Sequence, residues 1–463
     1  MDQTLSFVHN VGVNRGQIDL LQIDGLGSCI GQAVIALPDY QPVSDQCRYP
    51  RENVRRCGKE EQAFGQAWAH RFLIRGNANG GAMAGKVVSV KDAIAVAGVP
   101  QLIRSDTSQA WTPTTDATVV TRLLNAGADI HGTLTCENYY HSTSLYTSAQ
   151  GTVENPHKAG YSAGDSTSGG AALVAAGLVD IAIGDNQGEI FKYLQLCIGL
   201  KPTHGRVPFT GISSEYALVD HAGPLARTTL EAALCLDVIS GYDGIDDRSL
   251  GSPIPGSMRF AAAIQEGSGR LDGFKICIMK EGFEHVAVDP RAKTSVMTAA
   301  RKLESLGASI EEISLPEHLH GPAVWTILSW IAGAQTLLGH NTGRRGLCMT
   351  EAEHNRLPWT NEGLQRAFPS TKNVIINGLY QMARFPNLYG KTQSLFTKYD
   401  ALILPTAPIV APKHGKRGLP LESLQPSIGL TINTADDAQL MLPVGMQIVG
   451  LLWQENILQV GHA

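Results

Sequence analysis

The chain has 463 residues, of which 43% are hydrophobic and 17% charged, and 37 Lys and Arg against 42 Asp and Glu give a formal net charge of −5. The length would allow about three domains of roughly 150 residues each, and the composition excludes intrinsic disorder as the main state. The weak negative charge, with no block of like charges, argues against nucleic acid or an acidic membrane surface as a partner.

Regular patterns begin only after about residue 80. The residues before it show mixed apolar and charged runs, and we expect them to form an N-terminal extension (1–80) before a single large domain (81–463). Within that domain the apolar periodicity predicts strands at 86–90, 129–130, 179–183, 274–279, 309–313 and 401–404. It predicts helices at 116–125, which Asp116 would cap, at 171–178 and at 290–306. Strands that alternate with helices predict an α/β layered domain with a largely parallel or mixed sheet.

Nothing in the sequence predicts export, a membrane span or a bound metal. The first residues lack the basic and apolar regions of a secretory signal, and no apolar run reaches about 18 residues. The eight cysteines are scattered, without a Cys-x-x-Cys pair or a matching His spacing, so we expect reduced thiols and no metal cage. These features predict a cytoplasmic protein without a cofactor, and a homodimer is compatible with its size.

Lys91 is the first candidate for chemistry. It follows an apolar strand and precedes the run AIAVAGV at 93–99, which predicts a largely apolar setting for its side chain. The charged form of a buried lysine is costly, which favours the neutral amine of a general base. A lysine that reaches the surface or pairs with Asp92 is the commoner outcome.

The second candidate is the Gly/Ser loop, residues 162–170 (SAGDSTSGG), which runs directly into the predicted helix at 171–178. A loop of this kind exposes hydroxyls and backbone N–H groups at a helix N-terminus. Such groups suit an oxyanion or a bound anion.

The order and spacing of these motifs resemble the amidase signature family of carbon–nitrogen hydrolases. The resemblance rests on VVSVKDAIAVAGVP around Lys91, on the Gly/Ser loop and on GLKPTHGRVP at 199–208, and it extends over roughly residues 85–460. It implies an α/β/α layered fold with a central mixed sheet covered by helices, and a Ser-Ser-Lys triad in place of Ser-His-Asp. In that triad a neutral lysine takes a proton from a bridging serine, which deprotonates a nucleophilic serine that attacks the amide carbonyl.

Carried over by position, Lys91 corresponds to the lysine of this triad and Ser166 to the bridging serine. The other residues of the Gly/Ser loop at this point are Thr167, Ser168 and Gly169.

The chain departs from the family at the nucleophile itself. Matching Cys197 to the family's cysteine puts Glu189 in the nucleophile's place, whereas counting forward from Ser166 without a gap puts Ile190 there. Isoleucine has no nucleophilic atom. Glutamate would form an anhydride in place of the usual acyl ester, and its negative charge would favour the protonated form of the lysine, which cannot act as the base. The glycines on the oxyanion side are also reduced, which leaves Gln187 and Gly188.

Short losses relative to the family pattern, near 184–199 and 435–443, indicate either a decayed enzyme or misplaced splice junctions. The resemblance implies an amidase that cleaves the C–N bond of a small-molecule amide to a carboxylate and an amine or ammonia. That activity requires a replacement nucleophile, for which the local hydroxyls are Ser166, Thr167 and Ser168. The alternative is a pseudoenzyme, a catalytically inactive amidase-like protein that binds a ligand or a partner. A Schiff-base enzyme that uses Lys91 is a distant third, because no phosphate site for a carbonyl cofactor is found.

Overall fold

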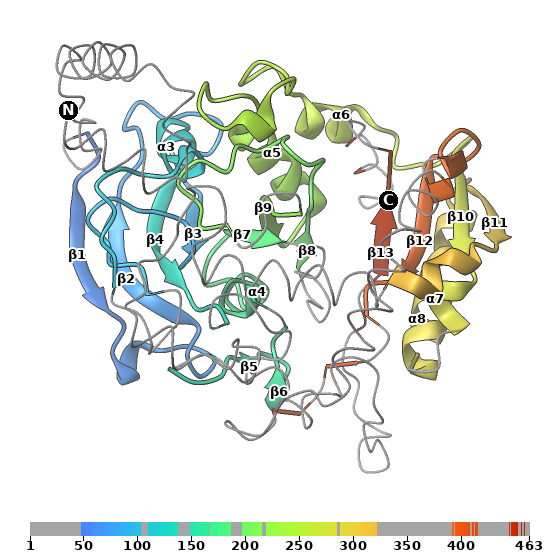
Figure 1. Cartoon of the computed structure of the whole chain (residues 1–463), viewed down its shortest axis with the longest axis horizontal. Helices are drawn as coiled ribbons and strands as arrows, with labels where there is room; N and C mark the ends of the chain where they lie inside the picture. The colour runs from blue at the N-terminus through green and yellow to red at the C-terminus, as the bar shows by residue number, and fades with distance from the viewer. Residues whose placement is uncertain are drawn as a thin grey trace, which may run out of the picture. The chain divides into compact units, whose positions relative to one another are not determined.

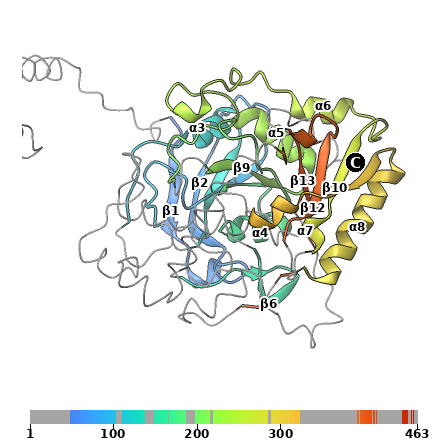
Figure 2. The same cartoon turned by 45° about the vertical axis from the view of Figure 1, so that its right-hand side comes forward.

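The structure is a computed structural model of the whole chain. It describes residues 48–102, 110–137, 148, 150–164, 166–186, 197–214, 219–284, 288–321, 391–392, 394–407, 410–411, 413–414, 444, 446–451, 455 and 458. The described strands form a seven-stranded sheet, a four-stranded sheet and a short hairpin, and residues 44–463 belong to one compact unit. Figures 1 and 2 show the course of the chain through these elements.

The larger sheet is mixed, as the sequence predicts, and its strand order is β1-β2-β4-β3-β7-β9-β8. Its strands are β1 (Arg51–Arg56), β2 (Trp68–Ile74), β3 (Val87–Lys91), β4 (Asp129–Leu134), β7 (Ile181–Asn186), β8 (Ile198–Gly199) and β9 (His221–Ala226). Strand β3 lies at the centre and is parallel to both β4 and β7, whereas the other neighbours pair antiparallel. Two of the strands, β1 and β2, come from residues before 81, where the sequence predicts an extension; the division at residue 80 stays a prediction.

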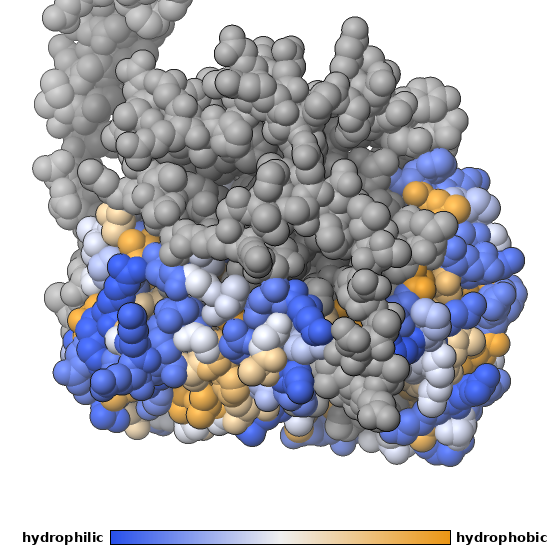
Figure 3. Space-filling view, turned by 90° about the horizontal axis from the view of Figure 1, so that it is seen from below, coloured by the Kyte–Doolittle hydropathy of each residue, from blue (hydrophilic) through white to orange (hydrophobic). Residues whose placement is uncertain are grey.

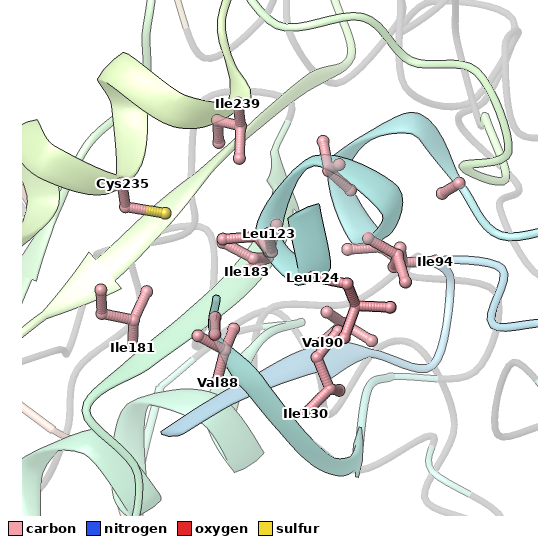
Figure 4. Packing of buried hydrophobic residues seen from close by; sticks show 14 of the residues in the cluster. Val88, Val90, Ile94, Leu123, Leu124, Ile130, Ile181, Ile183, Cys235 and Ile239 are labelled. Atoms are coloured by element: carbon pink, nitrogen blue, oxygen red, sulfur yellow. The ribbon is translucent and has the colours of Figure 1, made fainter. Parts of the chain in front are cut away.

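Helices cover both faces of this sheet, which gives the layered α/β arrangement. On one face, α3 (Thr118–Asn125) and α5 (Thr229–Ile239) pack on alternate strand residues, as Figure 4 shows for the side chains of β3 and β7. The other face is covered by α4 (Ser168–Ala175), whose apolar residues pack on β4, β7 and β9. Successive strand residues point to opposite faces, so apolar positions on both faces of β3 and β7 produce two separate cores.

The predicted apolar face of α3 is confirmed, but its predicted cap is wrong. Val119, Val120, Leu123 and Leu124 are all fully buried, and Gly127 follows the helix with a positive φ of 92°. The N-cap is Ala117, and no side chain caps the helix there. Asp116 instead accepts hydrogen bonds from the Arg51 guanidinium and, at 2.7 Å, from the backbone N–H of Ala97.

The smaller sheet has the order β11-β10-β12-β13 and is parallel except for its last pair. Its strands are β10 (Lys275–Met279), β11 (Ser309–Ile313), β12 (Ala401–Pro405) and β13 (Met446–Val449). Helix α8 (Pro290–Ser305) begins with Asp289 as its N-cap and Pro290 in its first turn, a combination typical of helix starts. Its apolar residues pack on β10 and β12.

The remaining described elements are short. They are the hairpin of β5 (Glu154–Asn155) and β6 (Lys158–Ser162), the helices α6 (Phe260–Glu266) and α7 (Glu281–Glu284), and 3-10 turns at Lys59–Glu61, Asp247–Ser249 and Pro316–His320. Every helix in the described part of the chain is too short or too polar to span a bilayer. Seen from below, the described surface is mostly hydrophilic, with only small hydrophobic areas (Figure 3).

Candidate active site

The candidate site lies where β3 and β7 end. These strands are parallel neighbours in register at Val90 and Ile183, so their carboxyl ends meet at the same edge of the sheet. Lys91 is the last residue of β3, and Asp185 is the penultimate residue of β7. The Gly/Ser loop begins at the last residue of β6, ends in the first turn of α4 and brings Ser166 to the same place.

Lys91 is completely buried, so it does not reach the surface. Its Nζ lies 3.0 Å from the Oγ of Ser166 and forms an ion pair with Oδ1 of Asp185. Asp185 is buried as well, with a side chain that is 9% exposed. A buried ammonium requires a charged or hydrogen-bonding partner, and Asp185 supplies one from the neighbouring strand.

The three consecutive hydroxyls of the Gly/Ser loop have different surroundings. Ser166 is half-buried and contacts Lys91, whereas Thr167 and Ser168 are 0% exposed. The hydroxyls of Thr167 and Ser168 have no hydrogen-bond partner among the described residues. The structure therefore places one hydroxyl, that of Ser166, within reach of the lysine.

Tight packing against glycines holds this loop in position. A Cβ on Gly169 would come within 2.4 Å of the carbonyl oxygen of Ala67 and 2.9 Å of the Thr135 backbone nitrogen. A Cβ on Gly184 would come within 2.8 Å of Cγ2 of Thr167. Only glycine permits these approaches, which seat the loop against β7 and against the segments that flank β2 and β4.

Asp185 is a site residue that the sequence analysis missed. The available signal was its place directly after a predicted apolar strand, at the edge where Lys91 was also expected. Polar side chains at the carboxyl ends of neighbouring parallel strands converge, and that rule would have singled it out.

Four predicted site residues, Gln187, Gly188, Glu189 and Ile190, lie outside the described residues, as does the predicted short loss at 435–443. The placement of Glu189 or of Ile190 at the family's nucleophile position therefore stays a prediction.

The GLKPTHGRVP motif contains a buried ion pair with the C-terminal part of the chain. The guanidinium of Arg206 donates to Glu455 at 2.6 and 3.1 Å, and the backbone N–H of Thr203 donates to the same carboxylate at 3.0 Å. Burial alone would raise the pKa of Glu455, but the hydrogen bonds from Arg206 and Thr203 outweigh it and hold that pKa below its usual range. This pair joins two segments that are distant in sequence.

A second polar cluster in this motif lies against β9. Nζ of Lys201 is 3.2 Å from Nε2 of His221, whose Nδ1 donates to the carbonyl of Val219 at 2.7 Å. The ring of His204 contacts that of His221 edge to face. Although the Lys201 side chain as a whole is exposed, desolvation of its ammonium lowers the pKa of Lys201 to about 8, against an opposing effect of Glu455.

Comparison with known proteins places this arrangement in context. The family model described as Amidase matches residues 60–458. An enantioselective amidase of Rhodococcus rhodochrous is 33% identical over 411 residues, which cover 80% of this chain and 77% of the relative. A glutamyl-tRNA(Gln) amidotransferase subunit from Synechococcus sp. (strain RCC307) is 30% identical over 431 residues, with 87% of each chain covered.

Solved structures with the same fold include a glutamyl-tRNA(Gln) amidotransferase subunit from Thermotoga maritima, with a TM-score of 0.66 at 23% identity over 86% of this chain and 85% of that one. A 6-aminohexanoate cyclic dimer hydrolase complexed with substrate has a TM-score of 0.65 at 24% identity, over 82% and 84% of the two chains. At these identities the likeness concerns the fold, and it agrees with the predicted layers around a mixed sheet.

Proposed function

The chain belongs to the amidase family, and from this premise we propose that it is a carbon–nitrogen hydrolase that cleaves a small-molecule amide to a carboxylate and an amine or ammonia. The observation that carries the proposal is the 3.0 Å contact between Nζ of Lys91 and Oγ of Ser166. In its neutral form a lysine amine at this distance takes the proton of the hydroxyl and activates it.

The surroundings of the two residues support this role. Lys91 ends a buried strand and has no freedom to move into solvent, while Ser166 is held by a loop packed against glycines. A base and a hydroxyl carried by rigid elements keep the geometry that proton transfer requires.

The substrate class follows from the same premise. Relatives named as amidases and amidotransferase subunits transform amides, and the net charge of −5 gives no attraction to nucleic acid.

Localisation and oligomeric state are proposed separately. The scattered cysteines support action in the cytoplasm. Size-exclusion chromatography with light scattering would test whether the chain forms a homodimer.

The test is hydrolysis of a panel of aliphatic, aryl and fatty amides by the purified chain, beside Lys91→Met and Lys302→Met. Turnover by the wild type is expected to disappear in Lys91→Met, since methionine fills the buried site without an amine. It should persist in Lys302→Met, because Lys302 is exposed on α8. Activity that survives in Lys91→Met would overturn the assignment of Lys91.

The second candidate function is that of an inactive amidase relative that binds a ligand. The observation in its favour is that neither residue matched to the family's nucleophilic serine, Glu189 or Ile190, is a serine. It predicts no turnover of any amide by a folded wild-type chain. In that case Glu189→Ser or Ile190→Ser should create hydrolysis if a single side chain has been lost. Failure of both variants would indicate that the geometry of the loop has been lost as well.

A further inference from the structure

Matching this chain to the amidase family leaves the proposed hydrolase without a nucleophile, because the matched residue is Glu189 or Ile190. We propose that Ser166 itself attacks the amide carbonyl, with Lys91 as its general base and Asp185 as the carboxylate that positions the lysine. The inference rests on the proposed hydrolase function and names the residue that carries the acyl group.

The first step is the choice among the three adjacent hydroxyls. Thr167 and Ser168 are fully enclosed, and Thr167 lies against Gly184. Ser166 is the half-buried member of the three, and its Oγ is the one that contacts the lysine. A nucleophile has to meet both its base and a substrate that arrives from solvent, and of the three hydroxyls Ser166 alone meets both conditions.

The second step is the orientation of the base. Nζ of Lys91 contacts Ser166 on one side and the Asp185 carboxylate on another. A nucleophile, a base and a third group that holds the base form the arrangement of a catalytic triad, here with an amine in place of an imidazole. Because Lys91 and Asp185 are carried by adjacent parallel strands, the sheet itself fixes their separation.

The third step is the chemistry of acylation. Lys91 first passes its ammonium proton to the paired Asp185 carboxylate. The neutral amine then accepts the proton of the Ser166 hydroxyl while the Oγ–carbon bond to the substrate carbonyl forms. The lysinium donates this proton to the amide nitrogen as the C–N bond breaks and the amine leaves. The product of this half-reaction is an ester between the acyl group and Ser166.

Deacylation repeats the same transfers with water. Lys91 accepts a proton from water as the hydroxyl adds to the ester carbonyl, and it returns that proton to Oγ of Ser166 when the carbon–oxygen bond breaks. The carboxylic acid that leaves ionises in water. The sum is amide plus water to carboxylate and protonated amine, with no oxidant or metal required.

The test traps the acyl group. The wild-type chain is mixed with 4-nitrophenyl acetate, quenched in acid and digested with trypsin, and amide turnover is followed separately with 4-nitroacetanilide. Residues 159–192 contain no internal Lys or Arg, so Ser166, Thr167, Ser168 and Glu189 all fall in one tryptic peptide, and fragmentation of that peptide locates the acetyl group.

The expected result is an acetyl group on Ser166 of the wild type. Ser166→Ala should form no adduct, and its kcat for amide turnover should fall by about a thousandfold or more. Ser166→Cys should restore a trapped adduct as a thioester at the same position, which separates loss of the nucleophile from loss of the fold. Asp185→Asn should lower kcat by about a hundredfold with little change in KM, as expected for a residue that acts through the base.

Two outcomes overturn the inference, and they are distinguishable. Turnover with the acetyl group on another residue, or an adduct that persists in Ser166→Ala, would reject Ser166 as the nucleophile and leave the hydrolase function in place. A folded wild-type chain with neither turnover nor adduct would reject the hydrolase function and, with it, the inference.

Discussion

Thr167 lies so close to Gly184 that a Cβ on the glycine would come within 2.8 Å of Cγ2 and 2.9 Å of Oγ1 of the threonine. The contact joins the Gly/Ser loop to β7, the strand that also carries Asp185. The position of Ser166 relative to Lys91 therefore depends on the absence of a side chain at residue 184.

Gly184→Ala should displace the loop and reduce amide turnover sharply, with a loss of stability of roughly 1–3 kcal/mol from overpacking. Adding Thr167→Ala removes the two atoms that would clash, so the double variant should regain stability and part of the turnover. Urea unfolding and turnover of 4-nitroacetanilide would measure both effects. Gly321→Ala is the matched control, because nothing lies within 4 Å of a Cβ at that position; equal losses in both variants would contradict the packing argument.

The buried pair of Lys91 and Asp185 should behave as one unit in stability as well as in activity. Lys91→Met leaves a buried carboxylate without its lysine, for which a loss of about 3–5 kcal/mol is expected. Lys91→Met combined with Asp185→Asn should be more stable than the sum of the single losses predicts, although it remains inactive. A double-mutant cycle in urea measures the coupling, and simple additivity would show that the pair contributes nothing.

Glu455 should make the stability of the chain depend on acidic pH. Its folded-state pKa lies below the unfolded value of 4.5, so its contribution is present above pH 4.5 and is lost as the pH falls through the folded pKa. Glu455→Gln is expected to cost about 3 kcal/mol near pH 7, since Arg206 stays buried without its carboxylate. The difference from the wild type should shrink as the pH falls below about 4.5, and urea midpoints across this range would reveal it. A constant difference would mean that the charge of Glu455 is not what stabilises the fold.

Lys201 should make the stability of the chain depend on alkaline pH, again with stability that rises with pH. Its pKa is about 8 in the folded chain and 10.5 in the unfolded one, so between these values the unfolded chain binds more protons and the folded state gains stability as the pH rises. Relative to Lys201→Met, the wild type should therefore become more stable between pH 8 and pH 10. Below pH 7 the difference between the two proteins should stay constant. A difference that decreases above pH 8 would show that the ammonium is favoured by the fold.

Helices and strands with strong periodicity were predictable from the sequence because their apolar residues repeat over a few positions. The buried face of α3, the strand β11 and the start of α8 at Pro290 all agree with the prediction. The capping of α3 was not predictable, because Asp116 is taken by Arg51, which lies 65 positions earlier in the chain. A local pattern contains no information about such a competitor.

The candidate site divides in the same way. Lys91 and the Gly/Ser loop were identified from their composition and from the family resemblance, both of which can be read along the chain. The choice of Ser166 over Thr167 and Ser168, and the pairing of Lys91 with Asp185, came only from the folded structure. Ser166 is 75 positions and Asp185 is 94 positions from Lys91 in the sequence. The packing of the loop on glycines brings Ser166 to the lysine, and the register of β3 against β7 brings Asp185 there.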